Sequence, residues 1–110
     1  MAAQSLDLLQ GTLDVLVLKT LSQGPTHGYA VSRAIRERSS GTLLVEDAAL
    51  YQSLHRLERQ GLLEAEWGLS ENNRKAKYYA LTGAGRARLR EETAAWRRYV
   101  TAVDQILEPA

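Results

Sequence analysis

The chain has 110 residues, a formal net charge of +1 and no cysteine. This length fits one small domain, and the lack of cysteine excludes a disulfide framework and thiolate metal sites. Apolar residues make up 45% of the chain and charged residues 25%, which are ordinary values for a globular protein and argue against disorder.

The N-terminal stretch, residues 1–21, lacks the basic start and continuous apolar core of a signal peptide. Its longest apolar run, Val15–Leu18, is too short to cross a bilayer, so we expect a soluble cytoplasmic protein.

In the same N-terminal stretch, apolar residues recur at helical spacing: Leu13, Leu16, Val17 and Leu21. They predict a core helix that Thr12 caps and that "SQGP" (22–25) ends.

A second helix is predicted from Thr26, with Ser39, Ser40 and Gly41 closing it. Its apolar stripe comprises Ala30, Val31, Ala34 and Ile35, and the opposite side carries Tyr29, Arg33 and Arg36. We expect His27 to be buried and bonded to backbone rather than to act as a ligand, and Gly28 to allow a close helix crossing. Residues 42–45 are β-prone and too few for a helix, which indicates a short strand or an extended connector.

The third predicted helix, residues 47–60, has two different sides. Turning each residue by about 100° puts Leu50, Leu54 and Leu57 on one stripe. The other side carries polar side chains: Tyr51, Gln52, His55, Arg56 and Arg59. Glu46 and Asp47 stand at its start, where the positive end of the helix dipole favours acidic groups. The second side is either solvated or reads a partner.

Strand periodicity follows after Gly61, and we predict a β-hairpin over residues 62–81. In the first strand Leu63, Ala65, Trp67 and Leu69 alternate with polar neighbours. The returning strand places Lys75, Lys77, Tyr79 and Leu81 on one side. The turn is formed by residues 72–75, where two asparagines suit a tight turn.

Thr82 is expected to cap a long last helix, residues 83–107. Its seam is spaced four, three, four, three and four and comprises Leu89, Thr93, Trp96, Val100, Val103 and Leu107. This heptad pattern is close to that of a coiled coil. Because the helix is far longer than its neighbours, we expect it to project, and we expect the seam to form a dimer interface. The expected division is a domain at 1–82 and a dimerisation helix at 83–110.

Charge is unevenly distributed along the chain. Residues 72–90 hold six basic side chains and no acidic one, so the remainder is net negative. A local positive patch suggests an anionic partner, although a charge run can equally be a solvated surface.

The order of elements predicts a mainly α fold with a small β-hairpin, an α+β arrangement of the winged helix-turn-helix kind. In that architecture the third helix enters the major groove of DNA and the hairpin, or wing, lies along the backbone. Gln52 can pair with adenine, and His55 can donate to guanine. The expected DNA-binding residues are Tyr29, Arg33, Ala49, Tyr51, Gln52, His55, Arg56, Arg59, Asn73, Arg74, Lys75 and Lys77.

The same residues also allow interpretations that do not involve DNA. Arginines opposite a leucine stripe occur on any solvated helix, and the Tyr51 ring could instead pack against the second helix. A winged helix can also serve as a protein–protein interaction module without nucleic acid. An enzyme is disfavoured because no Ser-His-Asp grouping and no glycine-rich phosphate loop stand out. We therefore expect no catalytic residue, no metal and no cofactor.

Three segments resemble the PadR family of bacterial winged-helix transcriptional regulators: "LVLKTLSQGPTHGYAVSRAI", "LYQSLHRLERQGLLEAEW" and "NNRKAKYYALTGAGRARL". The last is similar to the family's lysine-tyrosine-tyrosine-leucine-threonine-glycine wing signature. The resemblance runs from Gly11 to about Trp96, and it carries Tyr51, Arg74, Lys75 and Lys77 over as contacts to the DNA backbone.

The resemblance implies a homodimeric repressor of the short branch with a single C-terminal helix, which binds an inverted-repeat operator. It also implies release by a small aromatic or cationic effector. Trp96, a large aromatic residue in the middle of the seam, is the candidate to bind such a molecule, and a plain packing role is the alternative. Two departures bear on the operator. Acidic Glu46 and Asp47 precede the recognition helix, and Gln52 stands where proline is common, so the operator preference of relatives is not transferred.

Overall fold

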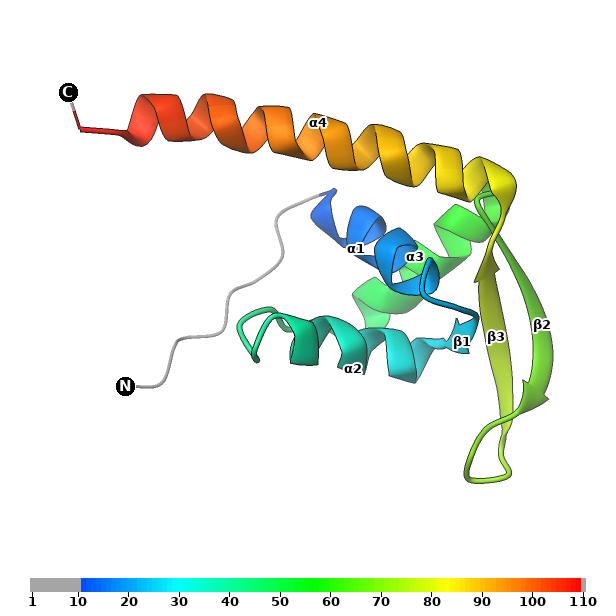
Figure 1. Cartoon of the computed structure of the whole chain (residues 1–110). Helices are drawn as coiled ribbons and strands as arrows, with labels where there is room; N and C mark the ends of the chain where they lie inside the picture. Colours follow the sequence, from blue (N-terminus) through cyan, green and yellow to red (C-terminus); the bar gives the residue numbers. More distant parts are fainter. Residues whose placement is uncertain (1–10, 110) are drawn as a thin grey trace.

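The computed structural model describes residues 11–109, which form a three-helix domain with a small sheet and a long helix (Figure 1). The elements follow in the order α1 (Thr12–Leu21), β1 (Thr26–His27), α2 (Gly28–Arg38), α3 (Asp47–Arg59), β2 (Leu63–Leu69), β3 (Lys75–Leu81) and α4 (Gly83–Leu107). The helices α1, α2 and α3 pack together, and the sheet closes one side of them (Figure 1). This order confirms the predicted winged-helix architecture.

The core lies where the apolar stripes of the first three helices meet the base of the hairpin. Its buried members are Val17, Leu18, Leu21, Val31, Ile35, Leu50, Leu54, Leu57, Leu62, Leu63, Tyr79 and Leu81. The stripes predicted for the second and third helices face this core. The connector at residues 42–45 forms no regular strand, and Leu43 and Val45 pack against the core from it.

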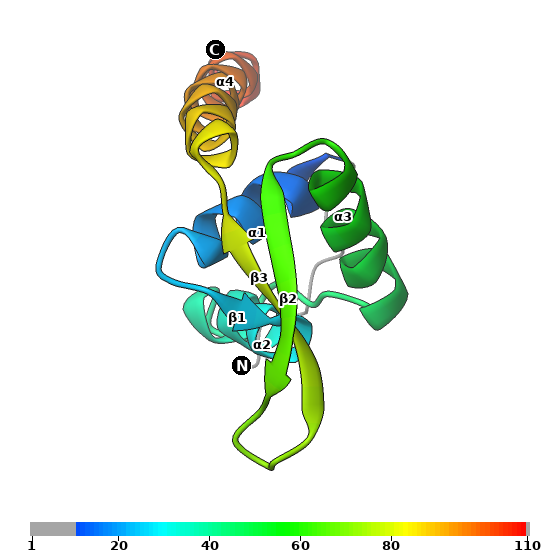
Figure 2. The ribbon, with the colours of Figure 1, turned by 90° about the vertical axis from the view of Figure 1, so that its right-hand side faces the viewer.

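The sheet has three antiparallel strands in the order β1-β3-β2 within the described residues. In the hairpin, Trp67 lies opposite Lys77, and Leu63 lies opposite Leu81. The hairpin reaches past the helices at its tip (Figure 2). There Asn73 adopts a left-handed conformation with φ 58°, which asparagine tolerates well.

The prediction that Thr26 opens the second helix is wrong. Thr26 and His27 are extended and pair with Tyr79 and Tyr78 of β3, and α2 begins only at Gly28. A two-residue strand shows no periodicity of its own. Its conformation is decided by the partner strand, about fifty residues away along the chain.

The predictions for Thr12, His27 and Thr82, which lie near the starts of three helices, had different outcomes. Thr12 does not cap α1, because Gly11 occupies the N-cap position and no side-chain capping bond forms. His27 caps α2 through Nδ1, which accepts the Ala30 N–H at 3.3 Å, so it is bonded to backbone but half-buried rather than buried. Thr82 caps α4 as predicted: its Oγ1 accepts the Gly85 N–H at 3.0 Å.

The helix α4 starts against the base of the hairpin and then runs over α1 and beyond it (Figure 1). At its start, a Cβ on Gly85 would collide with the Leu62 carbonyl oxygen, so only glycine allows this approach. Toward its end, large apolar side chains stand in solvent, with Ile106 83% and Leu107 73% exposed. The predicted projection of the last helix is confirmed.

Candidate nucleic-acid interface

One side of α3 is anchored in the domain and the other is free. Leu50, Ser53, Leu54 and Leu57 are buried. The exposed side carries four residues of the predicted DNA-binding set: Ala49, Gln52, His55 and Arg59. These side chains are available to a partner that lies along α3.

A cleft of about 610 Å³ separates the start of α2 from the wing. Six predicted DNA-binding residues line it: Tyr29, Arg33, Tyr51, Arg74, Lys75 and Lys77. They come from α2, α3 and the hairpin, so the fold gathers into one concave surface residues that are far apart in the sequence. Arg33 is also engaged along α2, where its Nε lies 3.4 Å from Glu37 Oε1 in an exposed pair.

Tyr51 crosses from α3 onto the first residue of α2. A Cβ placed on Gly28 would lie 3.0 Å from Cε1 of the Tyr51 ring and 3.1 Å from its hydroxyl oxygen. Tyr51 nevertheless remains 43% exposed. Gly28 therefore admits a close contact from α3, and the contact is made by the Tyr51 side chain. The same contact that packs the ring holds the hydroxyl at the cleft.

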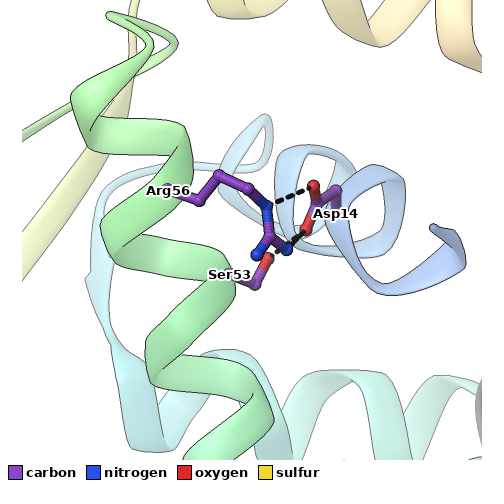
Figure 3. Close-up of polar contacts among 3 residues, drawn as sticks. All are labelled: Asp14, Ser53 and Arg56. Carbon is purple, nitrogen blue, oxygen red and sulfur yellow. Dashed lines mark hydrogen bonds and ion pairs between the residues drawn. The ribbon is translucent and has the colours of Figure 1, made fainter. Parts of the chain in front are cut away.

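Arg56 of α3 is turned toward α1, where it bonds to Asp14 (Figure 3). Its Nη2 donates to Oδ1 at 2.6 Å and its Nε donates to Oδ2 at 3.1 Å. Ser53 Oγ also donates to Asp14 Oδ1, at 2.6 Å. The hydrogen bond to Asp14 raises the pKa of Arg56, while burial acts in the opposite direction. The guanidinium thus has a partner inside the domain.

Lys77 of β3 is likewise tied to α3. Its Nζ lies 3.0 Å from Glu58 Oε1 and 5.4 Å from the centre of the Tyr79 ring. The hydrogen bond to Glu58 is the main reason that the pKa of Lys77 is raised. Burial raises the pKa of the Tyr79 hydroxyl. The ion pair therefore joins the wing to the recognition helix.

The remaining wing cations, Arg74 and Lys75, differ from Lys77. Within the described part of the chain, Arg74 and Lys75 form no ion pair, and both are exposed. The ammonium of Lys75 lies 5.1 Å from the centre of the Trp67 ring, which is 62% exposed. Stacking on an aromatic face holds a cation in place without neutralising it, so Lys75 keeps its charge available at the cleft.

Sequence reasoning missed the acidic partners. Asp14 was not singled out, although it is the acidic residue in the first turn of a largely apolar helix. Glu58, the partner of Lys77, was not singled out either. Both contacts join residues far apart in sequence, 42 positions for Asp14 and Arg56 and 19 for Glu58 and Lys77, and periodicity does not reveal such pairs.

The seam of α4 forms a second feature, away from the cleft. Leu89, Thr93 and Trp96 face α1 across an apolar groove of about 750 Å³. Further along α4, Val100 and Val103 are half-buried and Leu107 is exposed. Tyr99, which the heptad pattern did not include, stacks with Trp96 at 6.0 Å between ring centres.

Among residues 11–109, no helix is long and apolar enough to span a membrane.

Three packed helices, a wing beside the third helix and a cleft with free cations define a winged helix-turn-helix protein. Residues 17–91 match the Transcriptional regulator PadR-like family. The chain belongs to the PadR family, and it is therefore a transcriptional regulator rather than an enzyme. Regulators of this family bind DNA.

Solved structures and a protein sequence are similar to this chain. A crystal structure of a PadR family transcriptional regulator from Eggerthella lenta is 36% identical, with a TM-score of 0.78 over 92% of this chain and 86% of that chain. A transcriptional regulator from Clostridium thermocellum shares the fold, with a TM-score of 0.82 over 90% of this chain and 93% of that chain at 23% identity. An uncharacterised protein of Lysinibacillus sphaericus is 30% identical over 93% of this chain and 94% of its own length.

Proposed function

We propose that this regulator is a homodimeric repressor that binds an inverted-repeat operator through α3 and the wing. The observation that carries this proposal is the cleft between α2, α3 and the hairpin. It combines hydroxyl and ammonium donors from three elements, which suits phosphate oxygens. The exposed edge of α3 beside it offers Gln52 and His55, which suit base edges.

The proposed division of labour follows from chemistry. Tyr29, Tyr51, Arg74 and Lys75 bind the sugar-phosphate backbone and set the register. Phosphate contacts of this kind carry no sequence information. Sequence preference then comes from Gln52, His55 and Arg59 on α3. Glu46 and Asp47 stay exposed at the start of α3 without a side-chain capping bond from Glu46, so they disfavour phosphate at that end of the helix.

Dimerisation is proposed through α4, residues 83–110 forming the dimer helix and residues 1–82 the DNA-binding domain. Trp96, Tyr99, Ile106 and Leu107 are between 40% and 83% exposed. Leaving a large apolar side chain in water forgoes roughly 1.5–3 kcal/mol. A second copy of α4 would cover these side chains. An isologous pair would also hold two recognition helices about one DNA turn, roughly 34 Å, apart.

DNA binding is tested with a duplex selected from a random pool by the wild-type protein. Anisotropy titrations of the selected duplex and a shuffled duplex are compared at several salt concentrations. The proposal expects tight binding to the selected duplex and a steep loss of affinity with salt. A chain that enriches no duplex and binds none in dilute buffer would instead be a protein–protein interaction module.

Release by a small aromatic or cationic effector is proposed at the groove between α1 and α4, where Trp96 stacks with Tyr99. The chain has two tryptophans, so a Trp67→Phe variant leaves Trp96 as the sole indole. Planar aromatic cations that release the selected duplex from the protein are expected to change the fluorescence emission of Trp96. An effector that releases DNA without changing this emission contradicts the assignment of Trp96.

A further inference from the structure

A single carboxylate on α1 holds two points of the recognition helix (Figure 3). Asp14 Oδ1 accepts both Ser53 Oγ and Arg56 Nη2 at 2.6 Å, and Oδ2 accepts Arg56 Nε at 3.1 Å. Ser53 and Arg56 are three positions apart, so they lie on one face of α3, one turn from each other. Both carboxylate oxygens are therefore used by α3.

This geometry restricts how α3 can rotate. A two-bond arginine–carboxylate contact fixes direction as well as distance, and the bond from the fully buried Ser53 fixes a second point. Apolar packing by Leu50, Leu54 and Leu57 is non-directional and would tolerate a small rotation about the helix axis. The hydrogen bonds to Asp14 would not.

Rotation matters because each anchored residue is preceded by an exposed polar one. Gln52 precedes Ser53, and His55 precedes Arg56, so each pair is separated by about 100° around the helix. Fixing Ser53 and Arg56 against α1 consequently sets the direction in which Gln52 and His55 project.

We propose that Asp14, Ser53 and Arg56 are positioning residues for DNA reading. They set the rotation of α3 so that Gln52 and His55 meet base edges, and Arg56 acts through Asp14 rather than on DNA. This inference rests on the proposed function.

The competing assignment is that Arg56 contacts phosphate directly and Asp14 merely competes for it. The two assignments predict opposite signs for Asp14→Asn. A phosphate-binding Arg56 would be freed by this change, and DNA binding would strengthen on all sequences. A positioning Arg56 would lose its direction, and binding would weaken on the selected sequence only.

The test measures affinity of the full chain for the wild-type-selected duplex and for a shuffled duplex across a salt series. The variants are Asp14→Asn, Arg56→Lys and their combination, together with Ser53→Ala and Arg56→Gln. Arg56→Lys keeps the charge but removes the planar fork. Asp47→Asn, the same chemical change at an exposed position at the start of α3, is the matched control and is expected to strengthen binding to both duplexes. Circular dichroism melting confirms that each variant is folded at the assay temperature.

We expect Asp14→Asn and Arg56→Lys each to lower affinity for the selected duplex by about tenfold, while affinity for the shuffled duplex stays within about twofold. The double variant should lose no more than either single variant, and the salt slope should equal that of the wild type. Ser53→Ala should change affinity in the same direction to a smaller extent.

Three results would overturn the proposal. Asp14→Asn could strengthen binding to both duplexes, as Asp47→Asn does. Arg56→Gln could reduce the salt slope by about one, which marks a lost phosphate contact. Folded variants could also keep wild-type discrimination, which would leave the three residues a structural role only. If the wild type enriches no duplex at all, the proposed function itself fails. This result is different from the three above, in which the wild type binds its selected duplex and only the positioning role fails.

Discussion

The Tyr51 ring of α3 lies directly on Gly28, the first residue of α2, so closely that a Cβ at position 28 would be 3.0 Å from the ring. The space available, not the backbone conformation, limits this position: the backbone of Gly28 is not in the left-handed region, and a Cβ would fit only if the Tyr51 side chain moved by a few tenths of an ångström. This contact sets where the Tyr51 hydroxyl lies at the cleft.

Replacing this glycine tests the position of the tyrosine. Gly28→Ala should displace the partly exposed ring and weaken binding to selected and shuffled DNA alike, while stability changes by no more than about 1 kcal/mol. Anisotropy titration and thermal melting measure the two effects. Unchanged affinity for both duplexes would show that the location of Tyr51 is unimportant for DNA.

The junction between the hairpin and α4 should be much less tolerant. At Gly85 a Cβ would lie 2.7 Å from Leu81 Cδ1 and would collide with the Leu62 carbonyl oxygen. Overpacking of this kind costs about 3 kcal/mol, so Gly85→Ala should lower the free energy of unfolding by about that amount in urea titration. Gly83→Ala is the matched control, because no atom lies within 4 Å of its Cβ. Similar urea midpoints for the two variants would contradict the close approach.

Substitutions at two exposed residues, Gln52 and Arg74, should have different effects, because we assign Gln52 to base reading and Arg74 to backbone binding. Gln52→Ala is expected to reduce preference for the selected duplex by about 1–3 kcal/mol, with little loss on shuffled DNA. Arg74→Ala at the wing tip should lower the affinity for both duplexes equally and reduce the salt slope by about one. Competition titrations with both duplexes measure this. Equal losses on both duplexes for Gln52→Ala would refute its reading role.

Alkaline pH should destabilise the wing through Tyr79. Burial raises the pKa of this hydroxyl above its ordinary value of 10.0, so the folded state holds the proton more tightly than the unfolded state. The resulting stabilisation is complete below pH 10.0 and is lost as pH rises through the folded pKa. The pKa of Lys77 is also raised, chiefly by Glu58, and its contribution is lost in the same direction above its ordinary value of 10.5.

The measurement is the free energy of unfolding on either side of pH 10.0 for the wild type and Tyr79→Phe. The decline above pH 10.0 should be shallower in Tyr79→Phe, which cannot ionise. Equal slopes would mean that ionisation of Tyr79 is not linked to folding.

Local periodicity predicted the helices, the hairpin and the Thr82 cap because these features depend on residues near one another in sequence. Contacts between distant segments were not predictable in the same way. The two-residue strand Thr26–His27 exists only through pairing with β3. Trp67 and Leu69 fit the strand alternation but remain exposed, because the hairpin extends beyond the helices that cover its base.

The candidate site shows the same division. The exposed side of α3 was predicted from its leucine stripe, and Gln52, His55 and Arg59 lie there. In the sequence, nothing distinguished Arg56 and Lys77 from the other basic residues of the expected DNA-binding set. Their pairing with Asp14 and Glu58 depends on how α1 and β3 pack against α3, which a one-dimensional pattern does not encode.

The most direct test of the account is the mass of the protein in solution, free and on DNA, because repression by a symmetric pair requires two copies joined along α4. Sedimentation equilibrium at micromolar concentration should give twice the 12.2 kDa of one chain, and two chains should bind each selected duplex. A free monomer of 12.2 kDa that binds duplex DNA one chain at a time, or not at all, would contradict it.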